Sequence, residues 1–258
     1  MSRRAKLAAV VLRSVDYGEA DRVITLLTEA RGKISAFARG ARSSKRRFGG
    51  ALEPFTLLDA ELKERPGSDL WTLDSVVVRR AFGEIRQDLA RIACAGYACE
   101  LARELVREGE AQAELYALLV EYLELLDARP AEPVGLRAFE LRALDAAGVL
   151  PRLDACVRCG GALPAGARLR FDPGEGGVLC GRCGPAHARA PILSAETAAA
   201  LRRLLAGDLA AAAGAPLAQP GATEARDALA AYIEHHLGRR LQSRKFLDEI
   251  APMLARPD

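Results

Sequence analysis

Apolar and polar positions alternate along the first 80 residues with the two-residue period of β-strands. Runs rich in Val, Ile, Leu, Thr and Phe are separated by turns that contain Gly or Pro. This pattern predicts five strands, at Ala5–Arg13, Asp21–Thr28, Lys33–Arg39, Phe55–Leu62 and Leu70–Val78. Five short antiparallel strands fit a small closed barrel, and the five-stranded oligonucleotide-binding barrel (OB-fold) is the simplest such fold. An SH3-like barrel fits the same pattern and stays open as an alternative.

After residue 80 the apolar positions recur every three or four residues, which is the period of amphipathic helices. The predicted helices are Ile85–Arg107, Ala111–Ala128, Val134–Ala147, Ser194–Leu205 and Thr223–Leu254, the last being one helix or a pair. A glycine-rich insertion with four cysteines occupies about 153–189, and the low-complexity stretch Ala210–Gly221 is interpreted as a connector. The predicted organisation is α+β, with an OB-fold domain at 1–80 and a helical domain with an inserted finger at 81–258.

The charge of the 258-residue chain is unevenly distributed, although its formal net value is only +3. Residues 1–80 hold 16 Lys and Arg against 10 Asp and Glu, whereas the remainder is net acidic. Between Arg31 and Arg47 there are seven basic residues and no acidic residue. This concentration favours a binding face for a polyanion over a general effect on solubility.

The basic stretch begins as a strand with two different faces. Ile34 and its alternate neighbours can join an apolar core, while the opposite face presents cations around Phe37. Cations suit phosphates, and an aromatic ring suits an unstacked base. The predicted nucleic-acid-binding residues are Lys33, Phe37, Arg39, Arg42, Lys45, Arg46 and Arg47. Tyr17, Phe48 and Trp71 are weaker stacking candidates, because an aromatic residue in a small barrel is more often part of the core.

Four cysteines form two C-x2-C pairs that are separated by twenty residues. Each pair can place two thiolates on one metal ion through a tight turn, and two such turns complete a tetrahedron. In a cytosolic protein a metal site is favoured over disulfides. The predicted ligands of one structural Zn²⁺ are Cys156, Cys159, Cys180 and Cys183. Four thiolates leave no position for a reactive water, and Cys94 and Cys99 are interpreted as buried helix residues.

The remaining sequence favours a binding protein over an enzyme. It contains neither the phosphate-binding G-x-x-x-x-G-K-[ST] loop nor the H-E-x-x-H or H-x-E…P-C-x-x-C patterns of zinc enzymes. No apolar stretch approaches the length of a membrane span, and the N-terminus is interpreted as a strand and not as a signal peptide. The expected location is the cytoplasm.

Several short motifs follow one another along nearly the whole chain. The N-terminal motifs are YGEADRVI at 17–24, Leu27-Thr28, Gly32, ARGAR at 38–42 and LEPF at 52–55. The middle motifs run from Phe139-Glu140-Leu141 through Gly148 to the cysteine pairs, including GGVLC at 176–180. Near the end stand His236-Leu237-Gly238 and Ser243-Arg244. Together these motifs resemble the RecO family of bacterial DNA repair and recombination mediator proteins.

The resemblance implies an OB-fold barrel followed by a helical domain with a zinc finger. It further implies a DNA repair protein of recombinational (RecF-type) gap repair, nucleoid-associated in the cytoplasm, that binds single- and double-stranded DNA and anneals complementary strands. With RecR, such a protein helps to load RecA onto DNA coated by single-stranded-DNA-binding protein, whose acidic C-terminal tail is an expected contact. Nucleotide hydrolysis is not expected.

A different class of function also fits the residues. A zinc-ribbon module that binds RNA or a protein, without annealing activity, would use the barrel as a scaffold. The C-terminal basic cluster fits either a DNA contact or a solvated helix face, and its members are Arg239, Arg240, Arg244 and Lys245.

Overall fold

The computed structural model describes residues 4–44, 47–65, 67–187 and 189–254, with the backbone alone at 251–254. The chain forms two compact units. One unit comprises Met1–Pro130 together with Phe246–Asp258, and the other comprises Ala131–Lys245. The first unit therefore extends beyond the predicted barrel domain, and the sequence-based division at residue 80 stays a prediction.

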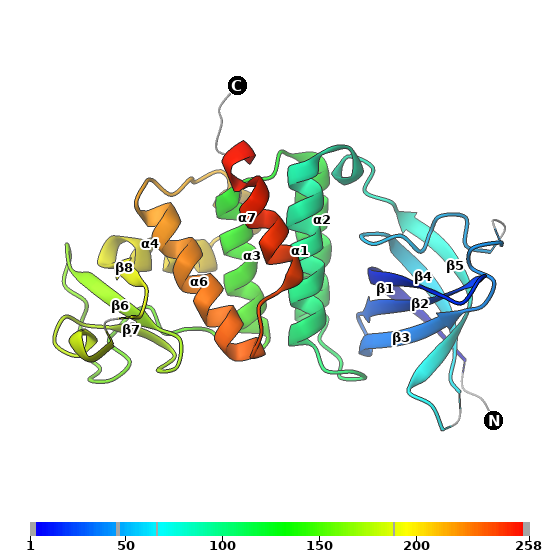
Figure 1. Cartoon of the computed structure of the whole chain (residues 1–258), viewed down its shortest axis with the longest axis horizontal. Helices are drawn as coiled ribbons and strands as arrows, with labels where there is room; N and C mark the ends of the chain where they lie inside the picture. Colours follow the sequence, from blue (N-terminus) through cyan, green and yellow to red (C-terminus); the bar gives the residue numbers. More distant parts are fainter. Residues whose placement is uncertain (1–3, 45–46, 66, 188, 255–258) are drawn as a thin grey trace. The chain divides into compact units, whose positions relative to one another are not determined.

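Five strands at the N-terminus close into a barrel (Figure 1). They are β1 (Arg4–Tyr17), β2 (Asp21–Thr28), β3 (Gly32–Ala38), β4 (Leu57–Lys63) and β5 (Leu70–Arg80). Their order around the barrel is β1-β2-β3-β5-β4, with β3 and β5 parallel and β1 closing onto β4. This is the arrangement of an OB-fold, so the predicted fold is confirmed and the SH3-like alternative falls away.

Strand β1 is longer than the sequence pattern indicates because it pairs with two neighbouring strands. Its first half, Arg4–Val10, pairs with β4, and its second half, Ala9–Tyr17, pairs with β2. A register shift between Val11 and Arg13 marks the change of partner. The end of β1 therefore projects with the β1–β2 turn (Gly18–Ala20) at one end of the barrel.

The barrel core consists of the inward-facing side chains of each strand. In β3 the buried residues alternate strictly with half-exposed ones, as the two-residue period predicts. The core includes Ile24, Leu26, Ile34, Ala36 and Leu73, and also Phe48 and Leu52 from the β3–β4 loop. The loop (Arg39–Thr56) is thus anchored by Phe48 and Leu52, and Phe48 is a core residue and not a free stacking surface.

Helices α1 (Leu89–Leu105) and α2 (Ala113–Ala128) follow the barrel within the same compact unit. A short 3-10 turn η1 (Ile85–Gln87) precedes α1, and α2 packs against α1. The predicted helix from Ile85 is interrupted because Asp88 is extended and caps α1, accepting a hydrogen bond from the Arg91 amide at 2.8 Å. Cys94 and Cys99 are buried in α1, as predicted.

The end of α1 covers one part of the outer face of the barrel. Lys33 Nζ donates to the Arg103 carbonyl at 2.8 Å, and the Gly109 amide donates to the Lys33 carbonyl at 3.0 Å. Leu27, opposite Lys33 on β2, is fully buried although it points outward. The rest of this face, toward the β1–β2 turn, is left accessible within the unit.

Gly32 is required by this packing. Its φ is +59°, and a β-carbon there would lie 1.8 Å from the Glu110 carbonyl oxygen. We expect Gly32→Ala to lower the free energy of unfolding by about 3 kcal/mol, through left-handed strain and a forced backbone shift. Gly18 has φ +60°, but a β-carbon there would meet no atom of the described residues within 4 Å, so Gly18→Ala should cost only about 1 kcal/mol. Urea unfolding of both variants measures the difference, and equal losses would contradict this interpretation.

The second unit is a helical layer with a small sheet. Its helices are α3 (Pro133–Ala146), α4 (Ala195–Ala206), α5 (Leu209–Ala213) and α6 (Gly221–Leu237). The sheet has the order β7-β6-β8, from β6 (Arg168–Asp172), β7 (Gly177–Leu179) and β8 (Ile192–Ser194), with a 3-10 turn η2 (Gly184–His187). Ser194 caps α4 as predicted, because its Oγ accepts from the Thr197 amide at 3.2 Å.

The structure decides two details of the C-terminal helices. The predicted terminal stretch is a helix pair, α6 and α7 (Gln242–Leu254), because Gly238 adopts a left-handed conformation with φ +66° and ends α6. The supposed connector contains the short helix α5, whose start is capped by the Asp208 carboxylate. Its alanines form helix because alanine has the highest intrinsic helix propensity.

Candidate nucleic-acid interface and metal centre

A row of apolar side chains crosses the accessible outer face of the barrel. Val15 pairs with Val23, and Val23 pairs with Phe37, so the three side chains share one face. Tyr17 follows two residues after Val15 on the same face, is 61% exposed, and meets Phe37 edge to face at 5.7 Å. We call Val15, Tyr17, Val23 and Phe37 the aromatic platform. Exposed aromatic edges on a β-sheet are suited to stacking against flat, unpaired bases.

Phe37 faces this side, as the strand period predicts. Tyr17, by contrast, is expected from the sequence to be only a weaker stacking candidate. The expectation that an aromatic residue belongs to the core of a small barrel holds for Phe48 but not for Tyr17. The signal was present in the sequence: Tyr17 directly precedes the turn glycine Gly18, and a residue at a strand end extends past the core. Trp71 is half-buried against the barrel core, with the Arg31 guanidinium 5.2 Å from its ring centroid.

Two exposed arginines border the platform where β3 leads into the β3–β4 loop. Arg39 directly follows β3, and its guanidinium has no ion pair within the described residues. Arg47 donates from Nη2 to the Arg39 carbonyl at 2.6 Å and from Nε to Ser44 Oγ at 3.2 Å. The partners of Arg47 are neutral, and Arg39 has no ion pair among the described residues. Both arginines therefore keep their positive charge available for an anion.

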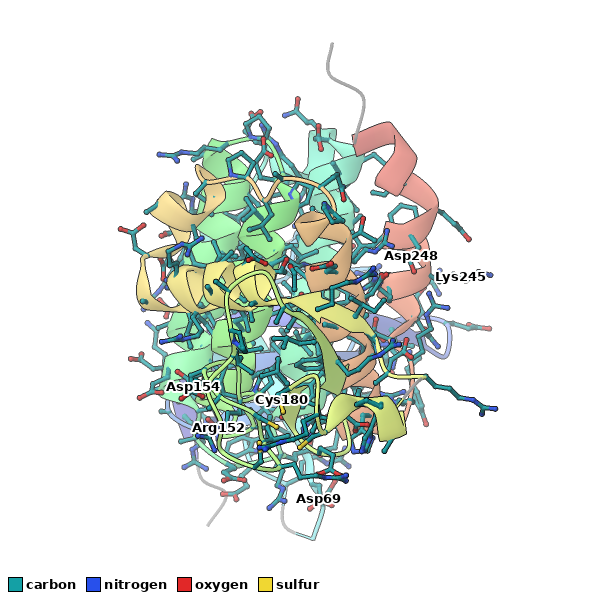
Figure 2. The ribbon with its side chains drawn as sticks, turned by 90° about the vertical axis from the view of Figure 1, so that its left-hand side faces the viewer. Asp69, Arg152, Asp154, Cys180, Lys245 and Asp248 are labelled. Carbon is teal, nitrogen blue, oxygen red and sulfur yellow. The ribbon has the colours of Figure 1, made fainter. Side chains whose placement is uncertain are left out.

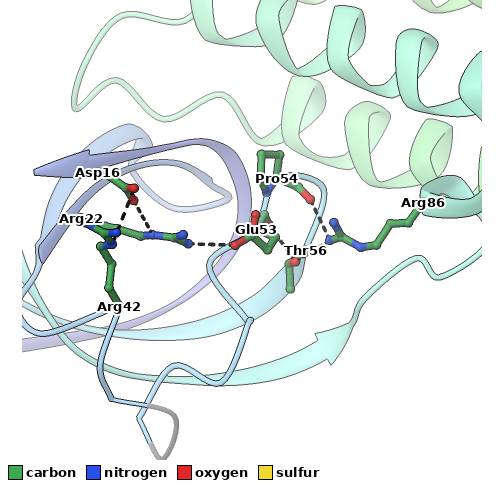
Figure 3. A network of polar contacts seen from close by, with 7 residues as sticks. All are labelled: Asp16, Arg22, Arg42, Glu53, Pro54, Thr56 and Arg86. Atoms are coloured by element: carbon green, nitrogen blue, oxygen red, sulfur yellow. Dashed lines mark hydrogen bonds and ion pairs between the residues drawn. The ribbon is translucent and has the colours of Figure 1, made fainter. Parts of the chain in front are cut away.

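Arg42 lies against the β1–β2 turn. Its backbone amide donates to the Ala20 carbonyl at 3.0 Å, and its Nη1 donates to the Glu19 carbonyl at 3.0 Å. Its Nε is 3.7 Å from Asp16 Oδ2 (Figure 3). The loop that carries the predicted cations is thereby held beside the turn that carries Tyr17.

Arg22 is the most firmly bound cation of this region. Its Nε lies 3.0 Å from Asp16 Oδ1 and its Nη1 lies 2.8 Å from Glu53 Oε1. Figure 3 draws both contacts as dashed lines. The hydrogen bond to Glu53, together with the charges of both carboxylates, outweighs burial and raises the pKa of Arg22. Nearby, Arg86 donates to the Pro54 carbonyl at 2.8 Å and fixes the far end of the loop.

The predicted binding residues thus fall into three groups. Phe37, Arg39, Arg42 and Arg47 lie together around the platform and the adjoining loop. A hollow of about 410 Å³ opens in that loop and is lined by Ala41, Arg42, Ser44, Gly49 and Gly50. The amino group of Lys33 is directed to the end of α1 instead. Lys45 and Arg46 lie outside the described residues.

The four predicted ligand cysteines form one cluster in the second unit. The Sγ atoms of Cys156, Cys159, Cys180 and Cys183 all lie within 4.8 Å of one another. Each C-x2-C pair sits in a tight turn, closed by the Gly160 amide on the Cys156 carbonyl at 2.9 Å and by the Cys183 amide on the Cys180 carbonyl at 3.0 Å. We call the two cysteine turns together with β6 and β7 the β6–β7 lobe. Figure 2 labels its Cys180, and also Arg152 and Asp154, whose side chains pair at 3.2 Å.

The spacing of the sulfurs fits a tetrahedral metal ion. Sulfurs about 2.3 Å from a central Zn²⁺ are about 3.8 Å apart in a regular tetrahedron. Cys159 Sγ and Cys180 Sγ are separated by 3.8 Å, which is far longer than a disulfide bond. The cluster is therefore consistent with a metal site, and four sulfur ligands leave no open position for substrate.

The surroundings of the cysteines favour thiolate ligands at one turn. Burial raises the pKa of Cys156, but the amides of Cys180, Cys159 and Arg158 outweigh it and lower this pKa to about 6. The Gly161 amide, followed by the Arg182 guanidinium, lowers the pKa of Cys159. Burial and the neighbouring sulfurs raise the pKa of Cys183 to about 12. A cation at the centre would compensate the negative charge of the thiolates. Its binding would also displace the remaining thiol protons.

Several other residues near the cysteines and the C-terminus are held by polar contacts or by burial. Arg158 pairs with Glu175, and His187 Nδ1 lies 2.5 Å from Asp172, which ties η2 to β6. In the C-terminal basic cluster Arg244 is only 7% exposed and Arg240 lies 3.4 Å from Glu234. No helix within the described part of the chain is long and apolar enough to cross a membrane.

Comparisons with known proteins cover almost the whole chain. Residues 1–82 match the family model "Recombination protein O N terminal", and residues 86–245 match "Recombination protein O C terminal". A protein named DNA repair protein RecO from Anaeromyxobacter dehalogenans is 66% identical over 251 residues, which is 97% of this chain and 98% of that protein. Proteins of the same name from Myxococcus xanthus (94% of this chain, 96% of that protein) and Geobacter sulfurreducens (95% and 97%) are 49% and 45% identical. The chain therefore belongs to the RecO family of DNA repair proteins.

Proposed function

We propose that the chain is a mediator of recombinational (RecF-type) gap repair that binds single- and double-stranded DNA and anneals complementary strands. With RecR it helps to load RecA onto DNA coated by single-stranded-DNA-binding protein. Its place of action is the nucleoid in the cytoplasm. RecO proteins are recombination mediators and not enzymes, so the proposal requires binding and release of DNA and no chemical step.

The observation that carries the proposal is the contact of the exposed Tyr17 with the half-buried Phe37, bordered by Arg39, Arg42 and Arg47. Arginines neutralise phosphates and release counterions, while the rings accept bases. A strand held by its backbone and by two stacked bases keeps its other bases free to pair. Annealing is then accelerated by charge neutralisation and by proximity.

In this proposal the cysteine cluster holds one structural Zn²⁺ through Cys156, Cys159, Cys180 and Cys183. The ion would supply folding energy to the β6–β7 lobe and no catalysis, because all four ligand positions are occupied by sulfur. The DNA interface and the metal therefore have separate roles in separate units of the chain.

An annealing assay with complementary fluorescent oligonucleotides tests the proposed function. The protein is expected to accelerate annealing of naked strands and of strands coated by single-stranded-DNA-binding protein, without added nucleotide. Tight binding of structured RNA, with no acceleration of annealing, would instead favour a zinc-ribbon RNA-binding module. Binding of a peptide with an acidic C-terminus, measured in parallel, tests the expected contact to the tail of the coating protein.

Tyr17 offers the most specific test of the platform. We expect Tyr17→Ala to weaken binding of a short single-stranded oligonucleotide by about 1–3 kcal/mol, the typical value for one base stacked on an aromatic ring. Tyr17→Phe keeps the ring and should retain most of the affinity. Because stacking carries no charge, the salt dependence of Tyr17→Ala should stay that of the native protein. Fluorescence anisotropy at several salt concentrations measures both quantities, and an unchanged affinity would exclude Tyr17 from the interface.

A further inference from the structure

A carboxylate lies between two arginines beside the aromatic platform. Asp16 Oδ1 is 3.0 Å from Arg22 Nε, and Asp16 Oδ2 is 3.7 Å from Arg42 Nε (Figure 3). The two ion pairs differ in strength. Arg22 is only 25% exposed and has a second carboxylate, Glu53, at 2.8 Å, whereas Arg42 is 46% exposed and is shared with a neutral carbonyl.

This difference assigns the two arginines separate roles. Arg22 connects the end of β1 to the LEPF segment of the β3–β4 loop, because it bridges Asp16 and Glu53. Arg42 is positioned by its bond to the Glu19 carbonyl, and its ion pair with Asp16 is long and open to solvent. Exposed pairs of this kind are weak and easily exchanged for another anion. A phosphate is such an anion, and it binds guanidinium groups well.

We propose that Asp16 competes with the nucleic-acid backbone for Arg42 and so limits how tightly the β1–β2 turn holds a strand. This inference rests on the proposed function, since it concerns regulation of the same interface. When a strand reaches the platform, a phosphate replaces Asp16 on Arg42, while the Glu19 carbonyl keeps the guanidinium in place. When the strand leaves, Asp16 pairs with Arg42 again. A built-in competitor lowers the barrier to release, which an annealing protein needs once the duplex has formed.

The test compares two neutralising substitutions in the same turn. Asp16→Asn frees Arg42, whereas Glu19→Gln removes an equal charge from a residue that contacts Arg42 through its backbone carbonyl. We expect Asp16→Asn to tighten binding of a fluorescent oligo(dT) two- to fivefold at low salt, while the log–log salt slope stays that of the native protein, because Arg42 contacts a phosphate in both complexes. Glu19→Gln should change affinity less than twofold, with the same slope as the native protein.

Arg42→Gln, made in the native and in the Asp16→Asn background, isolates the ion pair. The loss of affinity should be larger in the Asp16→Asn background, where Arg42 binds phosphate without a competitor. Equal losses in both backgrounds, or equal effects of Asp16→Asn and Glu19→Gln, would overturn the inference. Asp16→Ser serves as a second variant if Asp16→Asn does not fold, since Arg22 keeps its bond to Glu53 in both.

Failure of this inference can be distinguished from failure of the proposed function. If Arg39→Glu with Arg47→Glu weakens binding while Asp16→Asn behaves like Glu19→Gln, the interface stands and only the competition by Asp16 is wrong. If the double reversal leaves binding unchanged, the proposed interface itself is wrong, and any effect of Asp16→Asn arises elsewhere.

Discussion

Replacing Cys180 by serine is expected to remove most of the bound metal and to destabilise the β6–β7 lobe. Structural zinc contributes on the order of 10 kcal/mol to the folding of small zinc-finger peptides. Here the lobe has additional support, because Phe171 is fully buried and packs edge to face on Tyr232 of α6 at 5.6 Å. We therefore expect a smaller loss, about 5 kcal/mol in the free energy of unfolding of the second unit.

Elemental analysis and thermal unfolding measure this loss directly. The native protein should contain one zinc per chain, and Cys180→Ser much less. Cys99→Ala is the matched control, because Cys99 is buried in α1 outside the cluster and its loss should leave the zinc content at one per chain. Binding of single-stranded DNA by the barrel should survive in Cys180→Ser. Full zinc content with unchanged unfolding would contradict the assignment of Cys180 as a ligand.

Reversal of two charges beside the platform is expected to have the largest effect on DNA binding. If the native protein neutralises about six phosphates on a single strand, its log–log salt slope should be about −4. Arg39→Glu with Arg47→Glu removes two of these phosphate contacts, so the slope should fall in magnitude to about −3. Affinity at low salt should fall about 100-fold, since each lost phosphate contact is amplified there.

Lys6→Glu with Lys63→Glu is the control for this reversal. Both lysines are exposed on the β1–β4 side of the barrel, and the substitution changes the net charge by the same amount. The control should lower affinity less than fivefold, through the general field alone. If both double variants lose affinity equally, the effect of the arginines is one of net charge and not of a defined interface.

The strand periodicity predicted which side of β3 faces outward, but not what covers that side. Lys33 and Phe37 share the outer face, as expected from their even spacing. The end of α1 lies over Lys33, while Phe37 stays accessible beside Tyr17. The packing of α1 depends on contacts about 70 residues away in the sequence, such as Lys33 Nζ to the Arg103 carbonyl. A local pattern contains no information about such contacts.

The same limit applies to the charges. The density of arginines between 31 and 47 predicts a cationic region, but the carboxylates that approach it come from other parts of the chain. Asp16 on β1 and Glu53 at the end of the loop hold Arg22, and Asp16 also approaches Arg42. The cysteines were easier to predict, because two C-x2-C turns each fix half of the cluster locally and only their meeting depends on the fold.

Single-stranded DNA is expected to lie on the outer face of the barrel, across Tyr17 and Phe37. The most direct test is photochemical cross-linking of an oligonucleotide containing 5-iodouracil to the full-length protein, followed by peptide mass spectrometry. Such cross-links form with aromatic rings that contact the base. We predict adducts on Tyr17 or Phe37. Adducts confined to residues 131–245 would contradict this expectation.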